Sequence, residues 1–348
     1  NILQCFLSLR SNPASFLPED IVGEDVIGCP RSPFHEFTPM TTLLFYHPAF
    51  LEHDTGAGHP ESPERLRAIL KALEADDFTA LQRHEAPPAS EEQLQLVHPE
   101  SYVSQVLSAI PNVGYVGLDM DTIASPGSGE AALRAAGAVC AAVDAVMAGE
   151  GDNAFCAVRP PGHHAEPTRA MGFCLFNNIA IGALHARAAH GLGKVAVIDF
   201  DVHHGNGTEG VFRDDADLFY GSTHQWPHYP GSGAKEDRGV GNIFNEPLPA
   251  GSGGEAFRAA CGDVILPALN DFAPDFVFIS AGFDAHADDP LASLSLREED
   301  YAWVTAEMMD IASRHSSGRI VSALEGGYNL PALAASVSAH IKVLMGES

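Results

Sequence analysis

The sequence has no long uninterrupted apolar run and little basic charge. No segment approaches the ~18 to 20 consecutive apolar residues that a membrane-spanning helix needs, and no basic region followed by an apolar stretch stands near the first residue. We therefore expect a cytoplasmic protein with no membrane partner. Lysine and arginine total 19 against 46 aspartates and glutamates, so the formal net charge is −27. Because such a surface repels phosphate backbones, we expect no direct binding to nucleic acid.

The acidic surface itself has two explanations. It can serve solubility, or it can attract cationic substrates such as lysine-rich tails or polyamines. The second explanation predicts that kcat/KM falls as salt rises. The sequence leaves both explanations open.

Cysteine is scarce and scattered. The six cysteines form no C-x-x-C pair and have no regular spacing. This pattern argues against a disulfide framework and against a thiolate zinc site. The chain also lacks the Gly-x-Ser-x-Gly elbow of serine hydrolases and the Gly-x-x-x-x-Gly-Lys phosphate loop. A bound metal would therefore be held by histidines and carboxylates.

The chain divides at Met40. Residues 1 to 39 mix Pro, Ser and Cys without a period and are expected to be an extension outside the fold, either not native or poorly ordered. From Thr42 onward short apolar strands alternate with helical segments, which predicts one α/β domain over residues 40 to 348 with a parallel sheet. Strands are expected at 43–47, 154–159, 195–200, 218–222, 276–280 and 319–324, and helices over 63–73, 130–148 and 178–190.

The most informative segment is Val-Ala-Val-Ile-Asp-Phe-Asp-Val-His-His-Gly-Asn-Gly over residues 195–207. A buried strand leads directly into a charged, histidine-rich turn, and open parallel sheets place their ligand sites at this end of a strand. In an extended chain Asp199, Asp201 and His203 share one face, because side chains alternate with a period of two. This spacing is typical of metal ligands, although a single carboxylate here could instead cap the following helix.

A second strand, residues 276–280, is followed by Ala-Gly-Phe-Asp284. If the two strands are neighbours, Asp201, His203 and Asp284 form a three-ligand set with open positions for water and a carbonyl oxygen. A catalytic zinc ion requires such a set, and iron(II) would also be tolerated.

Two further segments offer acid–base and hydrogen-bonding groups. Arg-Pro-Pro-Gly at 159–162 ends a strand and presents His163 and His164 side by side, which suits general base and general acid work; a chance histidine pair in a loop is the alternative. In Glu-Gly-Gly-Tyr at 325–328 the two glycines allow close backbone approach and deliver Tyr328, whose phenol could hydrogen-bond an oxyanion.

Taken together, these segments closely resemble the histone deacetylase superfamily. The motifs that carry the resemblance occur in order at 159–164, 172–178, 199–207, 229–233, 281–284 and 325–328, and the likeness spans about Thr42 to Met345. Pro-Pro-Gly before the histidine pair, Asn206, and the pair Asn177 and Asn178 resemble the class II branch, with bacterial deacetylase-like amidohydrolases most similar. The resemblance implies the arginase/deacetylase fold, a single α/β domain whose eight-stranded parallel sheet is flanked by helices.

The resemblance also implies roles for individual residues. Asp201, His203 and Asp284 would bind zinc. His164 would act as general base and proton shuttle and His163 as its electrostatic partner, while Asp199 orients His163 and Asn206 orients His164. Tyr328 would be the oxyanion donor, and because it is Tyr, not His, we predict genuine catalysis. The implied substrate contacts are Phe173 and Tyr229 as tunnel walls with Gly172 beside them, Leu291 as a gate, and Asp119 or Asp121 for the substrate backbone. A structural potassium site would involve Asp199, Asp201, His203, Ser222 and Thr223.

We therefore predict zinc-dependent deacetylation of acetyl-lysine in proteins or peptides. An acetylpolyamine amidohydrolase is the main alternative, since it would use the same catalytic set; the short loop from Ser222 to Gly233 and Leu291 at the gate favour an open channel and the lysine substrate. A catalytically silent acyl-lysine-binding protein and a binuclear ureohydrolase are weaker alternatives, because the catalytic set is complete and no further bridging carboxylates are found. The physiological substrate, acyl length, native metal and any homo-oligomeric assembly stay open.

Overall fold

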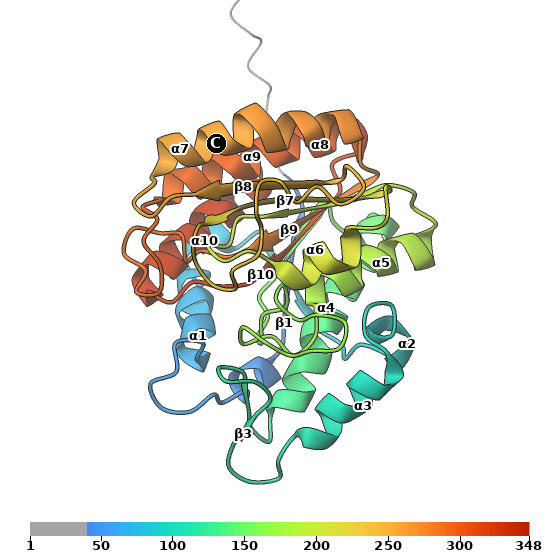
Figure 1. The fold of residues 1–348 in the computed structure, drawn as a ribbon, viewed down its shortest axis with the longest axis vertical. Helices are drawn as coiled ribbons and strands as arrows, with labels where there is room; N and C mark the ends of the chain where they lie inside the picture. The colour runs from blue at the N-terminus through green and yellow to red at the C-terminus, as the bar shows by residue number, and fades with distance from the viewer. Residues whose placement is uncertain (1–39, 348) are drawn as a thin grey trace, which may run out of the picture. The chain divides into compact units, whose positions relative to one another are not determined.

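The computed structural model describes residues 40 to 347, and the predicted extension at 1–39 lies outside the described residues. A central sheet of eight strands runs through the domain (Figure 1). Its strands are β1 (Thr42–Tyr46), β2 (Gln82–Glu85), β5 (Asn153–Cys156), β6 (Val195–Asp199), β7 (Leu218–Gln225), β8 (Ile243–Leu248), β9 (Phe276–Ala281) and β10 (Ile320–Leu324). Their order is β2-β1-β5-β10-β9-β6-β7-β8, and every neighbouring pair is parallel. The expected eight-stranded parallel α/β fold is confirmed.

All six predicted strands are present, and the two strands of the main sheet that the sequence did not indicate, β2 and β8, lie at its edges. β2 reads Gln-Arg-His-Glu and is mostly exposed, so no apolar run marks it. β8 contains Pro247, and proline in a sheet is largely confined to edge strands. A small antiparallel ribbon, β3 (Val116–Gly117) with β4 (Ile123–Ala124), lies outside the main sheet.

Helices cover both faces of the sheet. Figure 1 shows one layer that contains α7 (Gly254–Ala260), α8 (Leu266–Phe272) and α9 (Glu298–His315), and an opposite layer that contains α4 (Ser128–Ala148), α5 (Asn178–His190) and α6 (Asn206–Phe212). A π-helical turn, η3 (Cys261–Ile265), joins α7 to α8. The remaining helices are α1 (Pro63–Ala72), α2 (Glu91–Leu94), α3 (Glu100–Ala109) and α10 (Leu330–Leu344), with 3-10 turns η1 (Pro48–Leu51) and η2 (Asp76–Phe78). The central strands β5, β6, β9 and β10 are buried along their whole length, as expected for a parallel sheet covered on both faces.

Helix α4 is both long and apolar. Among the described helices it alone is long and apolar enough to cross a membrane, with a mean hydropathy of 1.6 over its most apolar window. Two thirds of that window, 67%, is buried inside the domain, where α4 packs against α5 and β5. Glu130, Arg134 and Asp144 interrupt its apolar residues, so α4 contains no uninterrupted apolar run of membrane-spanning length. The helix has the burial of a core helix, and its alanines permit close packing.

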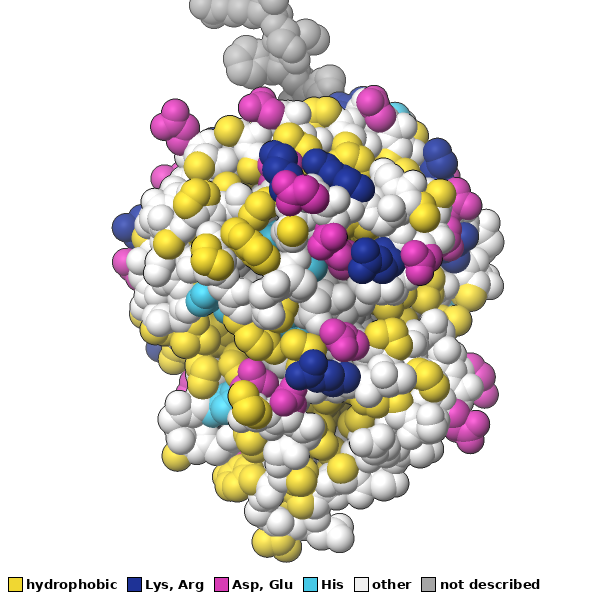
Figure 2. Space-filling model, in the orientation of Figure 1, with side chains coloured by type: hydrophobic (Ala, Val, Ile, Leu, Met, Phe, Trp, Pro, Cys, Tyr) yellow, Lys and Arg dark blue, Asp and Glu magenta, His cyan; other side chains and the backbone are white. Residues whose placement is uncertain are grey.

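The excess of acidic residues is not gathered in one patch on the face shown in Figure 2. There, Asp and Glu side chains lie scattered among Lys and Arg side chains. The acidic residues behind the net charge of −27 are thus mixed with basic side chains on that face. They do not form a focused acidic surface there.

The order of the strands determines where the functional residues meet. β6 lies between β9 and β7, and its last residue, Asp199, pairs in register with Ser280 of β9 and Ser222 of β7. Segments that leave β6 and β9 therefore emerge side by side at the carboxyl edge of the sheet. Ligand sites of open parallel sheets lie at this edge.

Candidate active site

The three predicted metal ligands lie together at the carboxyl edge. Nδ1 of His203 is 3.1 Å from Oδ1 of Asp201 and 3.2 Å from Oδ2 of Asp284. All three side chains are buried. β6 ends at Asp199, so Asp201 and His203 lie in the bend beyond the strand, and the alternation expected of an extended chain does not reach them.

The donor set fits a metal ion. One ligand atom from each of the three residues lies within 4.8 Å of the others. Oδ2 of Asp284 is buried and has no hydrogen-bond partner, whereas its Oδ1 accepts from the Val202 amide at 2.8 Å. The set offers one imidazole nitrogen and two carboxylate oxygens, and the Asp284 oxygen has no hydrogen-bond partner of its own. Nitrogen and oxygen donors of this kind are ligands of zinc and iron(II). Gly282 and Gly326 cradle the set, because a Cβ on either would overlap a carboxylate oxygen of Asp201 or Asp284.

The electrostatics of the two carboxylates also favour a cation. Burial and the charge of neighbouring Asp201 raise the pKa of Asp284 to about 7. Burial opposes ionisation of Asp201 as well, yet the charge of His163 and the hydrogen bond from His203 lower the pKa of Asp201 overall. Two buried carboxylates at this spacing repel each other unless positive charge lies between them.

His163 is held as a charged imidazole. Its Nδ1 is 2.9 Å from Oδ2 of Asp199, and its backbone amide donates to Glu325 at 3.1 Å. Burial works against the charge, but the carboxylates of Asp199 and Asp201 raise the pKa of His163 to about 10. These carboxylates favour the protonated form of His163, so His164 is the better placed of the two histidines to accept a proton.

His164 has the opposite character. Burial, followed by the positive charges of His163 and His203, lowers the pKa of His164 well below its usual value. Its Nδ1 lies 2.9 Å from Oδ1 of Asn206. The adjacent histidines are thus separated in protonation, with a neutral His164 beside a charged His163 at 4.0 Å between ring centroids.

Tyr328 lines the same cavity and is positioned through its backbone. Oδ2 of Asp289 accepts from the Tyr328 amide at 2.7 Å, and Arg65 donates to the carbonyl of Gly327 at 2.6 Å while its guanidinium lies 5.0 Å from the centre of the Tyr328 ring. Burial, and then the charge of Asp284, raise the pKa of Tyr328 well above 10. The phenol therefore stays a hydrogen-bond donor.

The cavity that joins these groups is lined by Asp121, Pro161, His163, His164, Gly172, Phe173, His203, Tyr229, Leu291, Gly326 and Tyr328. Gly172 and Phe173 have φ values of 57° and 67°, and a Cβ on Gly172 would overlap the ring of His164. This strained turn is held by Asp121, which accepts from the Gly172 amide at 3.2 Å, and by Thr122, which accepts from Phe173 at 3.1 Å. Nε2 of His59 lies 3.1 Å from the carbonyl of Asp121, and its ring meets Phe173 edge-on.

The structure distinguishes the two carboxylates between which the sequence could not choose. Asp121 lines the cavity, whereas Asp119 does not and instead lies 3.1 Å from Arg169. The ring of Tyr229 lies 5.1 Å from that of His164, and Leu291 lines the cavity as well. The predicted walls and gate are thus brought to one opening.

The predicted potassium ligands lie on adjacent strands. Asp199 of β6 pairs with Ser222 of β7, and Thr223 follows it. Oδ1 of Asp199 accepts from the Asp201 amide, and the hydroxyl of Ser222 bonds His224. The potassium site stays a prediction.

Several residues around the site had no signal in the sequence: Arg65, His98, Glu166, Asp289 and His59. They act on the site across long separations, as Arg65 does on residue 327. From the sequence alone, Asp289 looks like an ordinary carboxylate of a loop or a helix cap. The Glu-Gly-Gly-Tyr motif at 325–328 could have indicated that a partner holds this segment, but not that the partner is Asp289.

A fully parallel sheet with a buried histidine and carboxylate cluster at its carboxyl edge places this chain among α/β proteins with a metal-ligand set at the strand ends. Comparison with known proteins identifies the family. Residues 59–344 match the family model described as histone deacetylase domain. The chain belongs to the histone deacetylase family, and membership implies hydrolase activity of the deacetylase or amidohydrolase type.

Relatives occur in bacteria, plants and archaea. The chain is 44% identical over 286 residues to a histone deacetylase-like amidohydrolase of Pseudomonas aeruginosa, covering 80% of this chain and 75% of the relative. It is 41% identical over 310 residues to the chloroplastic histone deacetylase 10 of Oryza sativa (83% and 70%), and 38% identical over 298 residues to a probable deacetylase of Archaeoglobus fulgidus (84% and 82%). The crystal structure of the HDA15 HD domain matches with a TM-score of 0.84 and 38% identity, covering 89% of each chain.

Proposed function

We propose that this protein is a zinc-dependent deacetylase that hydrolyses the acetyl amide of acetyl-lysine in proteins or peptides. One observation carries the proposal: His164, the phenol of Tyr328 and His203 of the three-residue ligand set all line one cavity. Family membership supports the same class of reaction.

The ligand set would be Asp201, His203 and Asp284. The one imidazole and two carboxylates of this set are donors that zinc accepts, and the family is generally zinc-dependent. Iron(II) is compatible with the same donors. When bound, zinc supplies Lewis acidity that polarises an amide carbonyl and acidifies water.

His164 would take the proton of the attacking water. Nδ1 faces an amide oxygen, so Nδ1 carries the hydrogen and Nε2 keeps a free lone pair. Burial, and then the charge of His163 beside it, lower the pKa of His164 and favour its neutral form before the reaction. His164 would then give this proton to the amine nitrogen, and the carbon–nitrogen bond breaks as that nitrogen is protonated, so the product leaves as a neutral amine.

Tyr328 would donate its hydroxyl hydrogen bond to the oxyanion of the tetrahedral intermediate. Its raised pKa keeps the proton on the phenol through the reaction. The backbone contacts from Asp289 and Arg65 hold the segment that carries it, so the donor is in place before charge develops on the substrate.

The shape of the opening favours a lysine side chain on a polypeptide. Phe173 and Tyr229 provide apolar walls for a methylene chain. Oδ1 of Asp121 is used by Gly172 and Thr122, so Oδ2 is available to a substrate backbone amide at the rim. Leu291 at the opening offers no charge to a second amine, which a polyamine would present.

The test is acetate release by the purified protein from an acetyl-lysine peptide and from acetylputrescine at equal concentration, with and without chelator and added zinc. We expect a higher kcat/KM on the peptide, loss of turnover with chelator and recovery with zinc. A preference for acetylputrescine would move the function to an acetylpolyamine amidohydrolase. Turnover that resists complete metal removal would overturn the proposed ligand set.

A further inference from the structure

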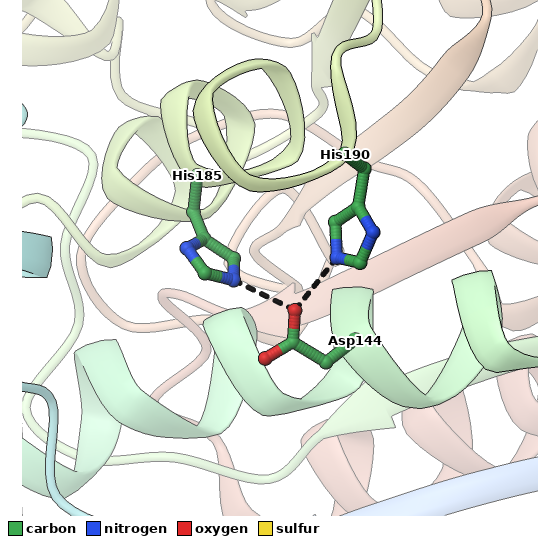
Figure 3. Close-up of side chains that lie close together, drawn as sticks. All are labelled: Asp144, His185 and His190. Carbon is green, nitrogen blue, oxygen red and sulfur yellow. Dashed lines mark hydrogen bonds and ion pairs between the residues drawn. The ribbon is translucent and has the colours of Figure 1, made fainter.

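A second group of metal-ligating side chains lies on the α4–α5 layer, apart from the active site. Asp144 projects from α4, and His185 and His190 project from α5 (Figure 3). Nε2 of His185 lies 2.8 Å from Oδ1 of Asp144, and Nε2 of His190 lies 2.7 Å from the same oxygen. Three ligand atoms from two helices thus converge on one point.

The geometry suits a four-coordinate ion. Zinc–nitrogen distances of about 2.0–2.1 Å place the ligand atoms of a tetrahedral site roughly 3.3 Å apart. The observed separations from the carboxylate oxygen are about half an ångström shorter, and the two imidazole planes lie at 87° to each other. A small outward shift of Asp144, whose side chain is 50% exposed, would admit the ion.

The accessibility of the three side chains leaves room for solvent ligands. His185 is 11% exposed and His190 is 24% exposed, so both rings are held by packing while the carboxylate side faces water. Two imidazoles and one carboxylate with open positions are ligands for zinc and similar divalent metals.

Local charge favours a cation as well. Asp144 lines a surface groove together with Glu85 and Glu150. Arg187, the only lysine or arginine of α5, pairs with Asp215 at 2.6 Å and so is engaged elsewhere. Arg187 therefore does not compete with a divalent ion for Asp144.

We propose that Asp144, His185 and His190 form a second divalent-metal site, suited to zinc, that joins α4 to α5. The first turn of α5 contacts the segment that carries the histidine pair, since Asn178 donates to the carbonyl of Pro160 at 3.0 Å. The proposed ion would lie toward the other end of α5, where the helix ends at His190. Its role is to stabilise the helix layer beneath the active site and not to take part in the reaction.

The proposal is tested by zinc content after equilibrium dialysis of the full chain in zinc-buffered solution. We expect two zinc ions per chain in the wild type, and one in His190→Ala and in Asp144→Asn. The matched control is His315→Ala, which removes a half-buried imidazole at the end of α9 and should keep both ions. The kcat of His190→Ala on its substrate should equal that of the wild type.

A second measurement separates this site from the active site. Asp284→Ala should retain one ion, and zinc should raise its Tm by a few degrees, whereas Asp284→Ala/His190→Ala should bind none and show no shift. Equal zinc content in the wild type, in His190→Ala and in Asp144→Asn would overturn the proposal. If circular dichroism shows that His190→Ala is misfolded, the conservative Asp144→Asn decides by the same criterion.

Discussion

Glu166 fixes the orientation of the Asn206 side chain. Nδ2 of Asn206 donates to Oε1 of Glu166 at 2.9 Å, while Oδ1 faces Nδ1 of His164 at 2.9 Å. An ionised carboxylate only accepts, so the amide nitrogen must point to Glu166 and the oxygen to the histidine. The histidine then carries its hydrogen on Nδ1, and Nε2 is left free to accept a proton.

Glu166→Gln should lower kcat without removing the metal. A glutamine side chain can donate or accept, so Asn206 is free to flip and present its nitrogen to His164, which favours the wrong tautomer. Outer hydrogen-bond partners of this kind are worth about tenfold or more. We expect a loss of about tenfold in kcat with little change in KM, measured by steady-state acetate release.

The control for this prediction is a double-mutant cycle with Asn206→Ala. If Glu166 acts through Asn206, the second substitution adds no further loss once Asn206 is gone. Glu150→Gln, an exposed site away from the cavity, should leave kcat unchanged. Additive losses in the cycle would show that Glu166 acts by another route.

Tyr328→Phe should lower kcat by about 10²-fold to 10³-fold, because it removes a donor that acts on the developing oxyanion. Its zinc content should match that of the wild type, since the phenol belongs to none of the three proposed ligands. Tyr229→Phe is the matched control: it deletes a hydroxyl from the cavity wall and should retain most activity. Full kcat in Tyr328→Phe would remove the phenol from the mechanism.

His98 should make the fold sensitive to mild acid. It is fully buried, accepts from the Asn177 amide at 2.9 Å through Nε2 and lies 3.1 Å from the carbonyl of Pro167 through Nδ1. Burial lowers the pKa of His98 to about 4. The unfolded chain, with a pKa of about 6.5, then binds the proton more readily, so stability is complete above that pH and falls as pH drops toward 4.

The size of this effect is about 3 kcal/mol, at roughly 1.4 kcal/mol for each tenfold difference in proton affinity. Urea unfolding at pH 7 and pH 4.5 measures it. His98→Asn should lose part of the difference between the two pH values, whereas His315→Ala should not. An unchanged difference in His98→Asn would assign the acid sensitivity to other buried histidines, such as His224 and His340, whose pKa values burial lowers to about 3.

Much of this arrangement could be predicted from the sequence where apolar strands run directly into polar residues. The strands before Asp201 and Asp284 were evident, and the structure places them side by side, so the three ligands converge. The histidine pair follows a strand in the same way. These features are local in the chain, and a parallel sheet brings its strand ends together.

The residues that orient the site could not be predicted for a physical reason. Arg65 lies in α1 and looks like an ordinary polar residue of an amphipathic helix, yet it donates to the carbonyl of Gly327. His98 and Asp289 also act on backbone groups far along the chain. Such contacts depend on the packing of complete elements and leave no pattern in the nearby residues.

Gly326→Ala should abolish metal binding although it adds a single methyl group. A Cβ at residue 326 would overlap Oδ2 of Asp284 and approach Oδ2 of Asp201. The glycine itself is held by two hydrogen bonds, since its amide donates to Oδ2 of Asp201 at 2.8 Å and its carbonyl accepts from the Phe283 amide at 3.0 Å. The carboxylates must therefore shift, which disperses the ligand set. Gly262→Ala is the control, because a Cβ there meets nothing within 4 Å and its φ is not in the left-handed region. We expect zinc content and kcat to fall together in Gly326→Ala and to stay at wild-type values in Gly262→Ala. A Gly326→Ala protein with full zinc and a reduced kcat would instead place the methyl group against the substrate, and one with full activity would contradict the close approach of this backbone to the metal ligands.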